Sequence, residues 1–79
     1  MKIVFTRHAR ERMKERGIGR KDVMEALANI LISVPAASQD REKIVGNAGG
    51  KKIQVIFKKE DNVLIIITAM EVAPDAGFN

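Results

Sequence analysis

The spacing of apolar side chains changes once along this chain, and that change constrains its fold more than any other feature. Between residues 19 and 34 the apolar side chains recur three and four positions apart, at Val23, Ala26, Leu27, Ile30 and Leu31. This spacing predicts an amphipathic helix that ends before Pro35, because a proline ring disfavours the helical conformation of the preceding residue. From residue 41 onward apolar and polar side chains alternate, which is typical of strands with one buried face.

Shorter signals place the elements of the first half. We expect a strand over Lys2–Phe5, which is rich in β formers, and a helix over Arg7–Arg16 with Thr6 as its N-cap. Gly17 supplies the left-handed residue that commonly closes a helix, and Ile18 can fold back onto the last turn. The second helix then begins almost at once.

Gly19 is a weak N-cap for this second helix, with Asp22 three residues later.

The second half of the chain has the pattern of strands joined by turns. We expect a connector at 33–40, turns at 47–50 and 59–62, and strands at 41–45, 52–58 and 63–70.

The order of these elements is strand, helix, helix, strand, strand, strand. Helices followed by a run of strands predict a two-layer α+β fold, in which an antiparallel sheet carries both helices on one face. The chain has 79 residues, which suits one domain because so short a chain buries only about 60–65% of its unfolded surface. We place the domain at 1–72 and expect a frayed tail at 73–79.

The predicted sheet has more apolar surface than two helices can cover. A hairpin that turns over 59–62 places Ile53, Val55 and Phe57 on one face with Leu64, Ile66 and Thr68. The other face then carries Ile56, Val63, Ile65 and Ile67. We therefore expect a second copy of the chain, or a protein partner, to close that face.

Positive charge is concentrated at the start of the chain. Residues 1–21 contain eight lysines and arginines but only Glu11 and Glu15, so their net charge is +6. The whole chain carries +4, which leaves a net charge of −2 for the remainder. This asymmetry favours a polyanionic partner such as nucleic acid.

The first helix places one histidine beside two arginines. His8, Arg12 and Arg16 follow each other four positions apart, so they form a ridge along the border of the buried stripe of Ala9 and Met13. Cleavage of RNA without a metal needs a base, an acid and cations. Histidine suits the proton transfers and arginine suits the phosphate.

Other polar residues complete this candidate site. We predict His8, Arg12, Arg16 and the strand hydroxyl of Thr68 as catalytic residues. The predicted nucleic-acid contacts are Arg10, Lys14, Arg41, Lys51 and Lys52.

Each of these residues also has a structural interpretation. His8 can serve in capping or packing, and Thr68 can be an ordinary strand residue. Arg7 with Glu11, and Arg12 with Glu15, can form ion pairs on a solvated helix; Arg10 and Lys14 then lie on the same solvated flank. Arg16 lies on the apolar side of the helix, where its partner could be a carboxylate or a carbonyl.

The sequence also resembles known small domains. HARERMKERGIGRKDVMEAL, followed by IIITAMEV, resembles an uncharacterised family marked by a His-Ala pair, spaced arginines, Gly-Ile and a late Val-Ile-Thr strand. The matching residues are His8, Ala9, Arg12, Arg16, Gly17, Ile18, Val23 and Thr68. The element order is similar to that of the RelE/ParE and BrnT toxins, which act on messenger RNA or gyrase and are neutralised by a bound antitoxin.

That resemblance implies a RelE-like toxin that acts as a metal-independent endoribonuclease, with His8 and Thr68 in catalytic positions. The chain lacks tyrosine and tryptophan, so base stacking would fall to Phe5, Phe57, Phe78 or an arginine plane. Two alternatives stay open. One is a nucleic-acid-binding module without catalysis, and the other is a protein–protein interaction domain whose arginines are structural.

Composition limits the other classes of function. A single histidine and no cysteine leave few metal ligands, so we expect neither a metal site nor a cofactor. The N-terminus lacks the apolar stretch of a signal peptide, and the longest apolar run is far shorter than the roughly 18 residues of a membrane span. We therefore expect a cytoplasmic protein without membrane association.

Overall fold

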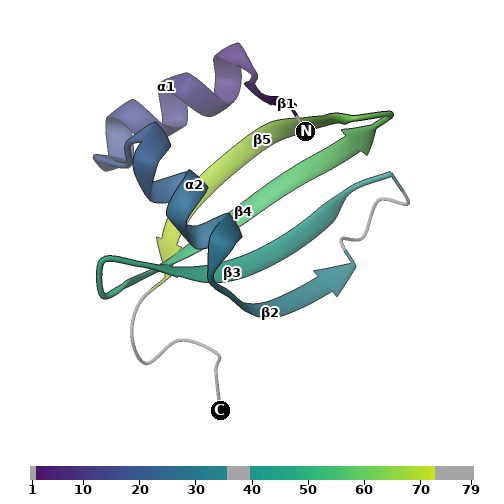
Figure 1. Cartoon of the computed structure of the whole chain (residues 1–79). Coiled ribbons are helices and arrows are strands. Elements are labelled where there is room, and N and C mark those ends of the chain that lie inside the picture. The colour runs from purple at the N-terminus through teal and green to yellow at the C-terminus, as the bar shows by residue number, and fades with distance from the viewer. Residues whose placement is uncertain (1, 36–39, 73–79) are drawn as a thin grey trace.

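Two helices lie on one face of a five-stranded sheet in the computed structural model, which describes residues 2–35 and 40–72 (Figure 1). The elements are β1 (Lys2–Phe5), α1 (Arg7–Arg16), α2 (Arg20–Ala28), β2 (Ile30–Pro35), β3 (Glu42–Ala48), β4 (Lys51–Glu60) and β5 (Val63–Val72). Buried side chains of both helices and of the three central strands join one core. The predicted two-layer α+β fold is therefore confirmed. The predicted tail at 73–79 lies outside the described residues.

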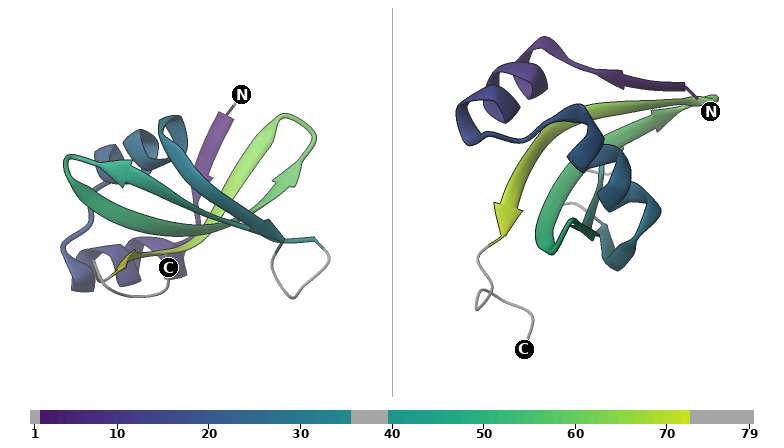
Figure 2. Two further views of the ribbon diagram at one scale, coloured as in Figure 1. Left: turned by 90° about the horizontal axis from the view of Figure 1, so that it is seen from below. Right: turned by 60° about the vertical axis from the view of Figure 1, so that its left-hand side comes forward.

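The sheet is mixed, whereas the sequence predicted an antiparallel one. The strand order is β1-β5-β4-β3-β2, and β1 runs parallel to β5 while the other neighbours are antiparallel. The two helices carry the chain over one face, from the β1 edge to the β2 edge (Figures 1 and 2). The direction of β1 depends on this path, which no local sequence signal specifies.

Local capping residues set the ends of α1 as expected. The Thr6 hydroxyl accepts a hydrogen bond from the Ala9 N–H at 3.0 Å. Gly17 is left-handed, with φ of 68°, and the Ile18 N–H donates to the Met13 carbonyl at 2.8 Å. Ile18 is buried. These contacts reverse the chain tightly, so α2 begins close to the end of α1.

The second helix is shorter than its apolar spacing predicted. It ends at Ala28, and Asn29 leaves the helical conformation with its side-chain amide bonded to the Glu25 carbonyl at 2.9 Å. Ile30 and Leu31 are exposed members of β2, so extending the helix over them, and starting the connector at residue 33, was wrong. An apolar run of this length is compatible with a helix or a strand. Here the segment is a strand because it pairs with β3.

The second helix packs directly on the backbone of β3. A Cβ atom built on Gly46 would overlap the carbonyl oxygen of Ala26 and lie 2.8 Å from its Cα. Ala26 is fully buried. Glycine is therefore required at this crossing, because any side chain would separate helix and sheet.

A β-bulge in β5 changes the face of one predicted residue. Phe57 pairs with Ile66, but Ile56 pairs with Thr68, which leaves Ile67 as the extra residue. Thr68 therefore shares a face with Ile56, and Ala69 takes the inward position. The prediction that Thr68 shares a face with Ile53, Val55 and Phe57 was wrong, because the alternation of side chains does not reveal where a bulge adds a residue.

The face opposite the helices is open, as predicted for Ile56, Ile65 and Ile67. Its exposed large apolar side chains include those of Val4, Ile32, Val34 and Met70. No strand or helix of the described residues covers this face (Figure 2). It is the surface on which the candidate site is found.

Candidate nucleic-acid interface

The open face is hollowed beside the start of α1, where an imidazole and two cationic side chains surround an apolar floor. The hollow has a volume of about 580 Å³, and its lining residues are Thr6, His8, Arg41, Lys58, Ile65 and Ile67. These residues come from α1, β4, β5 and the segments before α1 and β3. No acidic side chain is among them. The hollow therefore suits an anionic ligand that also has an apolar part.

Strand pairing explains how the two cations come together. Lys58 lies opposite Ile65 in the β4–β5 pair, and Phe57 lies opposite Glu42 in the β3–β4 pair. Arg41 immediately precedes Glu42, so it extends the row of Lys58 and Ile65 across the sheet. The sequence predicted His8 as a catalytic residue and Arg41 as a nucleic-acid contact, and both line this hollow.

His8 is held at the border of the sheet by its neighbours in α1. The Thr6 cap fixes the first turn, and Ala9 is fully buried against the core. His8 lies between these two anchors and is itself exposed. Its backbone position is therefore defined, although its imidazole is open to solvent.

Lys58 stays charged throughout the physiological range. Its ammonium group lies 3.0 Å from a carboxylate oxygen of Glu60. The hydrogen bond that Lys58 donates to Glu60, and the attraction of the Glu60 charge, raise the pKa of Lys58 above its ordinary value of 10.5. The ammonium group is thus permanently charged beside the apolar floor of the hollow, and Glu60 offsets part of that charge.

Arg16 does not reach the hollow, because it is bonded to β5. Its Nη1 donates to the Ala69 carbonyl at 2.9 Å and to the Thr68 hydroxyl at 3.4 Å. Of the two partners considered for Arg16, the carbonyl is confirmed. The pairing of β5 with β1 ends at Ile66. Beyond that residue β5 lies beside α1, and the Arg16 side chain bonds to a backbone carbonyl of β5. Arg16 and Thr68 thus meet in a structural contact.

Arg12 also points to a neighbour within its own helix. Its Nη1 lies 3.3 Å from a carboxylate oxygen of Glu15, and Arg7 pairs in the same way with Glu11 at 3.2 Å. Both pairs are exposed and contribute about 0.3–0.5 kcal/mol each. Neither Arg12 nor Arg16 lines the hollow, so the ridge with His8 does not converge on one point.

Comparison with known proteins identifies the family. The model of a domain of unknown function, DUF4258, matches residues 5–71. The chain belongs to the DUF4258 family. No curated protein and no solved structure matches the chain, so the comparisons give no support to the expected resemblance to RelE, ParE and BrnT toxins.

The other predicted contacts of the DUF4258 domain are dispersed. Lys51 and Lys52 begin β4 while Lys58 is near its end, a separation of roughly 20 Å at about 3.3 Å per residue. Lys14 is exposed on α1. Arg10 lines a second, smaller hollow beside β1. The domain therefore presents two separate basic sites.

Sequence reasoning missed Lys58 as a site residue, although its alternation with Phe57 already placed it on the face of Ile56 and Ile65. Thr6 was predicted only as a cap.

Residues 2–35 and 40–72 contain no helix long and apolar enough to span a membrane. The same residues hold no cluster of three or more acidic or histidine side chains that could bind a metal ion.

Proposed function

We propose that this DUF4258 domain binds single-stranded RNA on the open face of its sheet. The observation that carries the proposal is the hollow in which His8, Arg41 and Lys58 surround an apolar floor. Its lining includes no acidic side chain, and Arg41 forms no ion pair within the described residues, whereas Lys58 is paired with Glu60 outside the lining. Arg41 and Lys58 provide charge for phosphate groups. Ile65 and Ile67 provide a surface against which an unstacked base can lie.

The geometry favours a single strand over a duplex. A base can contact Ile65 and Ile67 only if it is free of its complement, as in loops and ends of RNA. The net positive charge of residues 1–21 speeds encounter with a polyanion. Both features support binding without requiring any chemical step.

Arg41→Gln is expected to weaken binding of a short single-stranded RNA about fivefold at 0.1 M salt, because the loss of one phosphate contact removes about 0.7 from the salt slope. Fluorescence anisotropy over a series of salt concentrations measures both quantities. Lys51→Gln is the matched control, since it removes one charge from the far end of β4. Equal losses in the two variants would show that only net charge matters and would overturn the proposed site.

Metal-independent RNA cleavage is a second candidate, because the histidine of the described residues lies in the hollow with two cations. In this reaction His8 takes the proton of the 2′-hydroxyl, and the 2′-oxygen bonds to phosphorus as the bond to the 5′-oxygen breaks. Water supplies a proton to that leaving oxygen. The products are a 2′,3′-cyclic phosphate and a 5′-hydroxyl, and Arg41 and Lys58 offset the charge on the phosphate.

One experiment separates binding from cleavage. Expression of the wild-type chain and of His8→Ala, with growth and RNA integrity followed in parallel, tests the toxin activity that the resemblance implies. Cyclic phosphate ends that appear only with the wild type would support cleavage. Intact RNA after expression of either protein, together with undiminished RNA binding, would support binding without cleavage.

The rest of the open face remains available for a protein partner. Ile32, Val34 and Met70 are exposed there, away from the hollow. We expect a second copy or an antitoxin-like protein to cover these side chains. Sedimentation velocity at micromolar concentration tests this expectation, and a monomer with no co-purifying protein would contradict it.

A further inference from the structure

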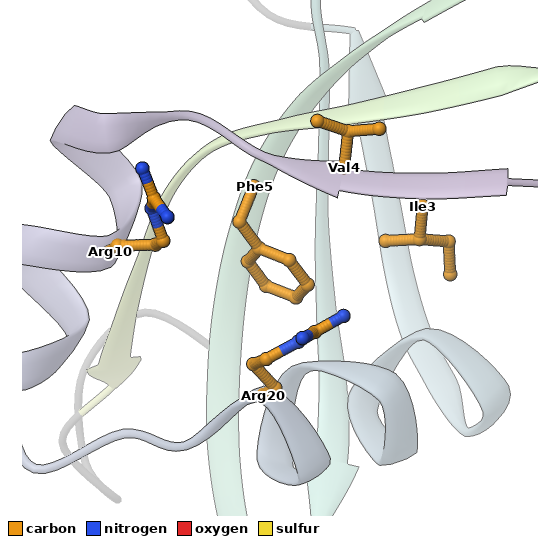
Figure 3. A pocket seen from close by; sticks show the side chains of 5 residues that line it. All are labelled: Ile3, Val4, Phe5, Arg10 and Arg20. Atoms are coloured by element: carbon orange, nitrogen blue, oxygen red, sulfur yellow. The ribbon is translucent and has the colours of Figure 1, made fainter.

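A second hollow lies between β1 and the start of α2, and two arginines from different helices line it. Its volume is about 230 Å³, and its lining residues are Ile3, Val4, Phe5, Arg10 and Arg20. Figure 3 shows the Phe5 ring between the side chains of Arg10 and Arg20, with Ile3 on the same side of β1. No acidic side chain lines this hollow either.

These two arginines differ from their neighbours because neither has an anionic partner among the described residues. Arg7 and Arg12 form ion pairs with glutamates, and Arg16 is bonded to β5. Arg10 and Arg20 make no ion pair within 2–35 and 40–72. Two guanidinium groups beside one hollow repel each other, and a bound anion would relieve that repulsion.

The Phe5 ring helps to position one of the two cations. The guanidinium carbon of Arg20 lies 5.1 Å from the centre of that ring, a distance at which a cation and an aromatic face attract each other. The ring is itself packed against the core. Arg20 is therefore held beside the hollow before any ligand arrives, which reduces the entropy lost on binding.

The free edge of β1 adds hydrogen-bond donors to the same place. Lys2 and Thr6 direct their N–H groups to carbonyls at the β5 side, those of Asn62 and Ile66. Because successive N–H groups of a strand point in opposite directions, those of Ile3 and Phe5 face away from β5. That edge has no neighbouring strand in the described sheet.

We infer that this second hollow binds the phosphate group of a nucleotide, with Arg10 and Arg20 as its cationic ligands. Guanidinium groups bind phosphate oxygens through paired hydrogen bonds, and the sugar and base then contact Ile3 and Phe5. A volume near 230 Å³ is below the roughly 300–1,000 Å³ of most ligand pockets. The hollow therefore accommodates no more than one nucleotide unit. The choice of a nucleotide among phosphate compounds rests on the proposed function.

Titration of the full chain with adenosine 5′-monophosphate, followed by two-dimensional NMR, tests this inference. We expect shifts of the Nε–H signals of Arg10 and Arg20 and of the ring protons of Phe5. Arg10→Gln and Arg20→Gln should each weaken binding about tenfold, the loss that corresponds to one charge-assisted hydrogen bond. Arg7→Gln is the matched control, because Arg7 lies on the same helix but is paired with Glu11.

Adenosine and a glutamate-rich peptide are the comparison ligands. Adenosine should shift these signals much less than the monophosphate, and an equal shift would overturn the phosphate assignment. A larger shift with the acidic peptide would assign the hollow to a protein segment instead. Absence of any shift with the monophosphate would also overturn the inference. Oligonucleotide binding that depends on Arg41 would still support the proposed function in each of these cases.

Discussion

Gly46→Ala is expected to destabilise the domain by about 3 kcal/mol, near the upper end of the usual effect of overpacking. The added methyl group would overlap the backbone of Ala26, and a backbone atom cannot rotate away as a side chain can. α2 must therefore move off β3, which separates the core residues Val23 and Ile44. The loss is large relative to a typical total of about 5–15 kcal/mol.

Urea denaturation followed by circular dichroism measures this change. Asn47→Ala is the matched control, because Asn47 is the next residue of β3 and is exposed. Its free energy of unfolding should stay within about 0.5 kcal/mol of the wild-type value, as for most surface substitutions. A Gly46→Ala protein as stable as this control would show that α2 does not pack on β3 as described.

The same crossing shows why sequence reasoning placed the first helix better than the second. The ends of α1 depend on Thr6, Gly17 and Ile18, which act on residues no more than five positions away. The end of α2 depends on β3, which lies far along the chain. Ile30 and Leu31 satisfy the spacing of a helix equally well, and only the pairing of Ile30 and Ile32 with β3 makes this segment a strand.

The candidate site was predictable to a similar degree. His8 and Arg41 were identified from residue type and element order, and the structure places both around one hollow. The sequence left open whether Arg16 binds a phosphate, a carboxylate or a carbonyl. Its partner, the Ala69 carbonyl, is 53 residues away along the chain, so no local pattern identifies it. The bulge at Ile67 sets the register that brings Ala69 to Arg16, and alternation of side chains carries no signal for it.

Arg10 and Arg12 illustrate how charge patterns mislead in this helix. Both are basic residues of α1, but Arg12 has a glutamate one turn away and Arg10 faces a hollow that contains no carboxylate. Net charge therefore predicts a polyanionic partner without predicting which cations are available to it. The two available sites lie on either side of β1 and Thr6, one on the open face and one beside α2.

Arg16→Met is expected to lower the free energy of unfolding by about 1.5–3 kcal/mol, the usual contribution of a hydrogen bond to a charged group. Methionine keeps an unbranched apolar stem of comparable reach, so the loss reports mainly on the bonds to Ala69 and Thr68. The edge of β5 and the last turn of α1 should then exchange their amide protons faster than the rest of the core. Urea denaturation and hydrogen exchange measure the two effects.

Arg12→Met is the control that separates structure from binding in this helix. Arg12 is paired only with exposed Glu15, so its loss should change stability by less than about 0.5 kcal/mol. If Arg16 acted on RNA rather than on β5, Arg16→Met would retain wild-type stability and lose RNA affinity. If the structural assignment is right, the folded Arg16→Met protein binds RNA as the wild type does, because Arg41 and Lys58 still surround the hollow.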